Sequence, residues 1–317
     1  MSLRLDVVAA AVGTTLLATT IALSATYSRA ESDLDWSNFG LGIIAALGLL
    51  GIAAAAFVMV RDDALKSNLV AWPGALGAIG AGLMIAVAMD DSGATGYVAG
   101  LATVAISAGG FFVVRRGAFV VAAVIGLLVT YANLVDDVFG VEDGGDNLGI
   151  TSTAALLVFA IAVTAGGWSF STRDISGVFV GAVTAFGFVS VLAGLLVAAL
   201  FQQLVGGLSG DLGVGGAPDK NRFDNDVYVI VLFTLVLVAG WAACSWMSGH
   251  VGYLVLILVT LTSVLPLATA ALAVEHPSYW GLGIGVLGAV VLAVVGMRGL
   301  GMFPTSAAGS RRLHRPA

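Results

Sequence analysis

The residues best suited to bind a ligand form a short polar group within an otherwise apolar segment. Thr130, Asn133 and Asp137 are spaced i, i+3 and i+7, and Asp136 lies three residues after Asn133. Residues at such spacings share one face of an α-helix. With the neighbouring Tyr131, they would present hydroxyl, amide and carboxylate oxygens at an outward-facing vestibule. We predict a substrate site for a cation or for a cationic or hydroxylated solute. The alternative is a helix end whose polar residues meet water and lipid headgroups.

Pro266 is a second candidate, because it lies in the middle of a strongly apolar segment. Proline removes one helical hydrogen bond, and the hydroxyls of Thr262 and Ser263 could satisfy the freed backbone groups. We predict a hinge here, or an unwound segment that lends carbonyls to a substrate or Na⁺. The alternative is a static kink. Pro73 lies near the start of its predicted segment, where a first-turn proline is tolerated.

Several kinds of chemistry have no signal in the sequence. The nucleotide-binding pattern GxxxxGK[ST] and the catalytic patterns GxSxG and HExxH are absent. The lone Cys244 can form no intrachain disulfide, and the three histidines lie at predicted helix ends or in the tail. No ionisable residue lies near the middle of a predicted span, which argues against a proton relay of midplane carboxylates. The sequence predicts no catalytic residue, no metal ligand and no cofactor.

The amino-acid composition indicates what kind of protein must position these residues. Hydrophobic residues make up 59% of the 317 residues and charged residues only 10%, against about 25% charged residues in soluble domains. Mean hydropathy is +1.04, so the chain cannot cover a water-facing globule and is predicted to be a polytopic membrane protein in contact with a lipid bilayer. A net charge of −6 provides no basic field for nucleic acid.

A spanning helix needs about 20 apolar residues, and the sequence contains ten such segments. We predict an all-α protein with one transmembrane domain over residues 1–298, followed by a basic cytoplasmic tail over 299–317. The predicted spans cover about 6–27, 39–60, 69–89, 94–114, 117–137, 148–170, 175–201, 226–247, 250–274 and 279–298.

The orientation follows from the distribution of charge. With both termini in the cytoplasm, ten of the 13 Lys and Arg residues lie on the cytoplasmic side, as the positive-inside rule requires. Fifteen of the 19 acidic residues then lie outside, although the rule makes no use of them. The abundance of Ala, Gly and Val, with Arg favoured over Lys, suggests a bacterial source. The predicted location is therefore the bacterial plasma (inner) membrane.

The loops offer weaker signals. The outer loop over residues 202–225 is rich in glycine and is predicted to be a lid or a docking surface for a protein partner, or else a flexible connection. Asp33 and Asp35 flank one leucine in the first outer loop, a pattern that occurs in membrane enzymes acting on lipid-linked sugars.

Glycine pairs at 96/100, 177/181 and 281/285 suit tight helix packing, but 43 glycines make them no more frequent than chance. The oligomeric state is therefore left open.

Three functions fit these observations. The first is a transporter or permease for a small solute or a lipid-related molecule, supported by the span number, the short loops, the mid-span proline and the polar vestibule. The second is a non-catalytic membrane subunit or scaffold of a larger cell-envelope assembly, which the lack of buried charge fits equally well. The third is a membrane-embedded enzyme acting on a lipid-linked substrate. The first is preferred, and the chain is not expected to be an enzyme.

Overall fold

The computed structural model describes residues 5–29, 33–61, 63–89, 92–140, 148–170, 172–212 and 224–273, with a few further residues between 285 and 292. Within these residues the chain is helical and contains no strand. The long helices, with their bounds, are α1 (Leu5–Tyr27), α2 (Trp36–Met59), α3 (Asp63–Met89), α4 (Thr95–Val114), α5 (Gly117–Phe139), α6 (Leu148–Gly167), α7 (Arg173–Leu212), α8 (Asp224–Ser248) and α9 (Val251–Ala273).

All nine of these helices in the described part of the chain are long and apolar enough to cross a membrane. The predicted all-α, polytopic membrane fold is therefore confirmed, and each of the first nine predicted spans corresponds to one helix. The predicted tenth span over 279–298 lies almost wholly outside the described residues, and so does the basic tail over 299–317.

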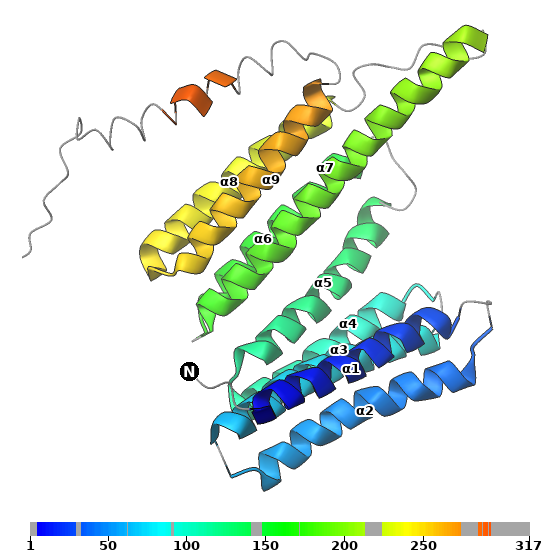
Figure 1. Ribbon diagram of the computed structural model, residues 1–317, viewed down its shortest axis with the longest axis vertical. Coiled ribbons are helices and arrows are strands. Elements are labelled where there is room, and N and C mark those ends of the chain that lie inside the picture. Colours follow the sequence, from blue (N-terminus) through cyan, green and yellow to red (C-terminus); the bar gives the residue numbers. More distant parts are fainter. Residues whose placement is uncertain are drawn as a thin grey trace, which may run out of the picture.

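The helices form two groups that follow the order of the chain (Figure 1). α1 to α5 pack against one another, and α6 to α9 form the second group. Among the described helices, α5 is the one member of the first group that contacts the second, and it contacts both α6 and α7. We call the contact of α5 with α6 and α7 the α5 seam.

The two groups have different cores. The second group is held together by large side chains, among them Phe188, Ile230, Tyr253 and Val264, which are fully buried. The first group is packed largely through alanine. Small residues let backbones approach closely, which compensates for the weak hydrophobic driving force between helices in lipid. The buried alanines of this group include Ala45, Ala46, Ala71, Ala75 and Ala122.

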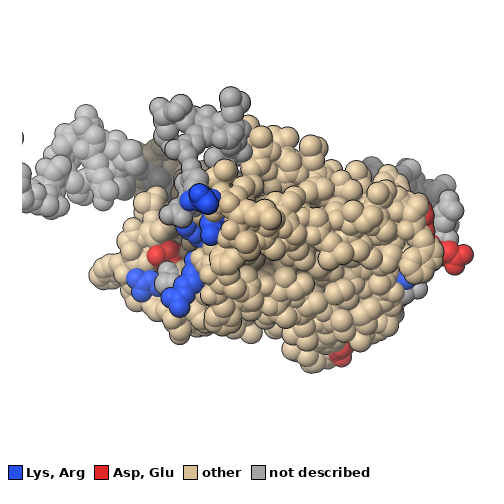
Figure 2. All heavy atoms as spheres, turned by 90° about the horizontal axis from the view of Figure 1, so that it is seen from below, with Lys and Arg blue, Asp and Glu red and all other residues tan. Residues whose placement is uncertain are grey.

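The outer surface is apolar, whereas charge is confined to the ends. Large hydrophobic side chains project outward along every helix, with Trp246 91% exposed. Such a surface is stable only when lipid covers it. Figure 2 shows Lys and Arg gathered at one end of the described molecule and most Asp and Glu at the other. This separation agrees with the predicted orientation, which places the cationic end in the cytoplasm.

Helix α3 begins six residues earlier than the sequence indicated. The expected start at 69 followed from the polar stretch before it, but polar residues can continue a helix beyond the hydrocarbon layer. Here the Lys66 ammonium lies 4.8 Å from the centroid of the Phe57 ring in α2, a favourable cation–π contact. Pro73 consequently lies inside α3, and its expected place in the first helical turn is wrong.

Helix α7 is the second departure from the sequence prediction. It continues to Leu212, whereas the span was expected to end at 201 and a loop to begin at 202. The expectation rested on Gly206, Gly207 and Gly210, but glycine costs a helix only about 1 kcal/mol relative to alanine. Residues 202–212 of the expected loop are thus helical, and residues 213–223 lie outside the described residues.

Asp35 starts helix α2 as its N-cap. Its Oδ1 accepts hydrogen bonds from the backbone N–H of Ser37 at 2.8 Å and from the Ser37 hydroxyl at 2.8 Å. Its Oδ2 accepts from the side-chain amide of Asn38 at 2.7 Å. These bonds, those from Ser37 foremost, lower the pKa of Asp35 below its ordinary value of 3.8. This acid of the predicted lipid-linked-sugar pattern therefore has a structural role.

The cap leads to a pH-dependent prediction. Because the folded-state pKa of Asp35 is lowered, its contribution to stability is present above pH 4 and is lost as the pH falls through the folded-state pKa. Asp35→Ala should lower the Tm by about 2 °C at pH 7, and the difference from wild type should shrink as the pH falls through the lowered folded-state pKa. Asp35→Asn keeps one acceptor oxygen for the cap without the charge, so its Tm at pH 7 should lie between those of wild type and Asp35→Ala. Equal melting curves for all three proteins at pH 7 would contradict this role.

Candidate functional site

The end of α5 on the predicted outer side carries all five residues of the predicted substrate site, but the structure divides them between two faces. Thr130, Asn133 and Asp137 face α4. The Thr130 hydroxyl donates to the backbone carbonyl of Gly126 at 3.0 Å, and the Asn133 side-chain amide donates to that of Val129 at 2.8 Å. The spacing thus correctly placed these three residues on one face, and that face is packed against another helix.

A pair of glycines on α4 makes this packing close. A Cβ atom at Gly96 would overlap the side-chain amide of Asn133, and one at Gly100 would overlap the Thr130 hydroxyl. The Gly100 Cβ would also lie 2.6 Å from the backbone carbonyl oxygen of Gly126. The 96/100 glycine pair therefore packs α4 on α5 within the chain.

Asp137 is fixed on the same side by a neighbouring phenol. The Tyr97 hydroxyl of α4 donates to Asp137 Oδ2 at 2.6 Å. A short bond between a phenol and a carboxylate is strong, because the acceptor is charged. Asp137 therefore ties the outer ends of α4 and α5 together.

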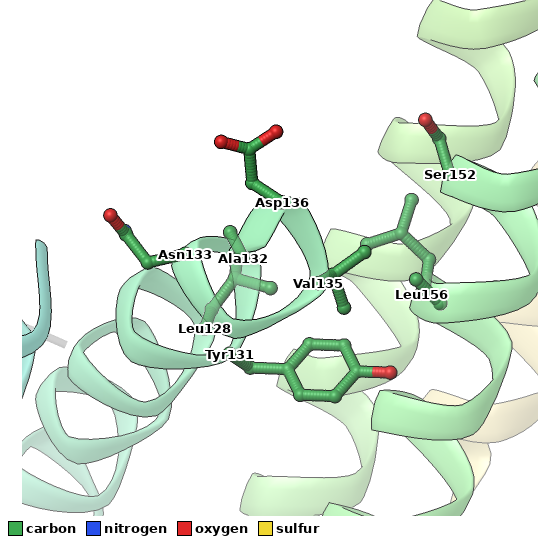
Figure 3. A pocket seen from close by; sticks show the side chains of 9 residues that line it. Leu128, Tyr131, Ala132, Asn133, Val135, Asp136, Ser152 and Leu156 are labelled. Carbon is green, nitrogen blue, oxygen red and sulfur yellow. The ribbon is translucent and has the colours of Figure 1, made fainter. Parts of the chain in front are cut away.

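The other face of α5 lines a pocket at the α5 seam. This outer pocket has a volume of about 340 Å³ and lies between α5 and α6. Figure 3 shows the Tyr131 ring reaching from α5 toward α6, with Asp136 at the rim and Ser152 opposite. The Tyr131 ring packs on Phe159 of α6, with ring centroids 5.4 Å apart. The lining residues are Leu128, Tyr131, Ala132, Asn133, Val135, Asp136, Ser152, Ala155 and Leu156.

Three of the five predicted residues thus line one pocket, and two do not. Tyr131 and Asp136 belong to the pocket together with Asn133, whose side chain points away from α6 in Figure 3. Thr130 and Asp137 belong to the α4–α5 contact. Ser152 of α6 completes the polar set. It was not predicted, because the pairing of α5 with α6 cannot be derived from the periodicity of either helix.

The outer pocket combines apolar walls with a few oxygen-bearing groups. Leu128, Val135 and Leu156 supply hydrocarbon surface, whereas Asp136 provides a carboxylate and Ser152 a hydroxyl. Mostly apolar pockets with a few placed polar groups are typical of small-molecule sites. A carboxylate at the rim favours a cationic group or a hydroxyl donor. No group of His, Cys, Asp and Glu that could hold a metal ion occurs within the described residues.

A second pocket lies at the α5 seam, toward the cationic end. It has a volume of about 450 Å³ between α4, α5, α6 and the start of α7, and its walls are almost entirely apolar. The seam therefore has a mostly apolar pocket with a few polar groups at the predicted outer end, and an almost entirely apolar pocket at the opposite, inner end.

Pro266, the predicted hinge, lies within an unbroken helix. α9 is helical from Val251 to Ala273, so the structure contains no unwound segment at this proline. The Thr262 hydroxyl donates to the carbonyl of Leu258 at 2.8 Å, and the Thr269 hydroxyl donates to that of Leu265 at 2.6 Å. Both hydroxyls therefore serve the backbone of α9 itself. A hinge at Pro266 stays a prediction.

Asp226 is a buried acid near the start of α8. Only 4% of it is exposed, and a Cβ at Gly149 of α6 would lie 2.8 Å from its Oδ2. It continues the buried stripe of α8 that includes Ile230, Thr234 and Trp241.

Comparison with known proteins gives no match: no family model fits the chain, and neither a curated protein nor a solved structure is similar to it. The chain is a multi-pass membrane protein by its helices. Its function has to be argued from the site alone.

Proposed function

We propose that this protein is a transporter for a small amphipathic molecule that carries a cationic or hydroxyl group. The observation that carries the proposal is the outer pocket, where Asp136, Tyr131 and Ser152 are set among apolar walls between two helices. A solute with an apolar body and a polar head matches this lining. The inner pocket of the same seam lies closer to the other side of the membrane, and its walls are almost entirely apolar.

The two helix groups suggest how such a molecule could pass. Transporters commonly move one helix bundle against another around a site that lies between them. Here α5 joins the first group to the second through α6 and α7, and both pockets lie along that contact. A small rotation of one group about the α5 seam would open one pocket while it closes the other. The proposed path does not require a proton relay of carboxylates at the membrane midplane. This agrees with the absence of ionisable residues near the middle of the predicted spans.

The proposal is tested by flux measurements on the purified protein in proteoliposomes. The probe is a fluorescent lipophilic cation, compared with a lipophilic anion of similar size. We expect uptake of the cation to be faster than in protein-free vesicles, and uptake of the anion to equal that background, because the outer rim carries Asp136. Cation uptake at the protein-free rate would contradict the proposal.

A second candidate function is that of a membrane subunit of an envelope assembly, and the length of α7 favours it. The spanning part of α7 ends at Ala198, whereas the helix continues to Leu212. At about 1.5 Å per residue, this extension would project roughly 20 Å beyond the bilayer on the predicted outer side. Residues 202–212 of this extension belong to the 202–225 segment predicted as a partner surface. Stoichiometric co-purification of an envelope protein from the native membrane, lost on deletion of residues 202–212, would favour this function over transport.

A further inference from the structure

The inner pocket of the α5 seam has features of a lipid site that the transport proposal does not require. Its volume of about 450 Å³ lies within the range of about 300–1,000 Å³ that ligand pockets occupy. The rings of Phe111, Phe112, Phe119 and Phe170 line it, and the small residue Ala123 forms part of its α5 wall. This lining suits a hydrocarbon chain.

One polar group is buried in this apolar wall. Ser107 of α4 is fully buried, lines the pocket, and its hydroxyl has no hydrogen-bond partner in the structure. A buried hydroxyl without a partner costs free energy that a ligand can recover by accepting its hydrogen bond. Ser107 lies seven residues before the end of α4 at Val114, or about 10 Å along the helix axis. An ester carbonyl just below a lipid headgroup would lie near this depth.

Three arginines lie close in sequence to residues that line the same pocket, at its cationic end. Arg115 and Arg116 form the short connection between α4 and α5. The N–H of Arg115 donates to the carbonyl of Phe111 at 2.7 Å, and the N–H of Phe119 donates to that of Arg116 at 3.2 Å. Both exposed arginines are therefore within one turn of pocket-lining phenylalanines. Arg173, at the start of α7, follows Thr172 of the pocket wall.

We propose that the inner pocket binds one acyl chain of an anionic phospholipid from the leaflet at the cationic end. Its phosphate pairs with Arg115 and Arg116, because guanidinium groups bind phosphate through two parallel hydrogen bonds. The Ser107 hydroxyl donates to an ester carbonyl of the same lipid. Anionic lipid is plentiful in the cytoplasmic leaflet, the side to which the charge distribution assigns these arginines. This inference does not rest on the transport proposal, although it concerns a pocket that the proposed path also uses, since a bound lipid could equally stabilise a subunit.

The test is lipid binding by the purified full-length protein in detergent, measured by native mass spectrometry. The probes are phosphatidylglycerol and phosphatidylcholine with identical acyl chains. Both lipids carry a phosphate, but the choline cation of phosphatidylcholine repels the arginines, so wild type should prefer phosphatidylglycerol by about tenfold. Arg115→Gln combined with Arg116→Gln should abolish this preference. The matched control is Arg61→Gln with Lys66→Gln, which removes two charges from other helix ends and should leave the preference intact. Equal affinity of wild type for both lipids, or an equal loss of preference in the control pair, would overturn the proposal.

A second variant tests the pocket rather than the charge. Ala123→Phe places a large ring in the lining, so binding of both lipids should fall together by about tenfold or more. The Tm of Ala123→Phe, measured without added lipid, checks that the variant is folded. A folded Ala123→Phe protein that binds phosphatidylglycerol as tightly as wild type would show that the acyl chain lies elsewhere, and would also overturn the proposal.

Discussion

Replacing Gly100 by alanine is expected to destabilise the protein by about 3 kcal/mol, at the upper end of the usual cost of overpacking. The added Cβ would overlap the Thr130 hydroxyl and lie 2.6 Å from the backbone carbonyl oxygen of Gly126. The backbone of α5 cannot rotate away as a flexible side chain can, so α4 and α5 must separate. Thermal unfolding in detergent, followed by circular dichroism, measures the effect.

The same helix provides a matched control. Gly109 of α4 has no atom within 4 Å of an added Cβ, so Gly109→Ala should leave stability unchanged or raise it slightly through better helix propensity. Truncating the neighbouring side chain in Gly100→Ala/Thr130→Ala should restore only part of the loss, because the Gly126 carbonyl remains. Equal Tm values for Gly100→Ala and Gly109→Ala would contradict the close contact between α4 and α5.

Much of the fold could be predicted from the sequence, because a spanning helix is identified by its own residues. Length and hydropathy sufficed to locate α1 to α9. The errors occurred at helix ends, where hydropathy is a poor guide. α3 extends through polar residues beginning at Asp63, and α7 extends through glycines as far as Leu212. Hydropathy reports where the lipid ends, whereas a helix continues until its backbone hydrogen bonding is interrupted.

The candidate site was predictable only in part, because a site also depends on which helices are neighbours. The i, i+3, i+7 spacing correctly placed Thr130 and Asp137 on one face, but it could not show that α4 covers that face. Tyr97 and the 96/100 glycine pair, which hold this contact, come from another helix. Likewise, the pocket on the opposite face needs Ser152 from α6. The sequence was sufficient to predict which residues could bind a ligand. The structure was needed to show which of them face α4 and which line the pocket beside α6.

Asp136→Asn is expected to weaken binding of a lipophilic cation by about tenfold or more, because hydrogen bonds to charged groups contribute about 1.5–3 kcal/mol. Asp136 lines the outer pocket together with Tyr131 and Ser152, and the amide removes the negative charge with little change in shape. Equilibrium binding to the purified protein, followed by the fluorescence of the cation, measures the dissociation constant.

Asp137→Asn is the natural control for this experiment. It changes the net charge by the same amount at the next residue, but Asp137 accepts the hydrogen bond of Tyr97 on the face packed against α4. Its effect on cation binding should be less than about twofold, whereas its Tm should fall because the bond to Tyr97 is weakened. Equal losses of affinity in both variants would indicate a general effect of charge and would argue against a site in the outer pocket.

The most direct test of the proposed transport path is cation uptake by proteoliposomes that contain wild type, Asp136→Asn or Asp137→Asn at equal protein density. If the outer pocket is the entrance, Asp136→Asn should take up the fluorescent cation at close to the protein-free rate, while Asp137→Asn should retain the wild-type rate. Wild-type uptake by Asp136→Asn, or an equal loss in both variants, would contradict a path through the α5 seam.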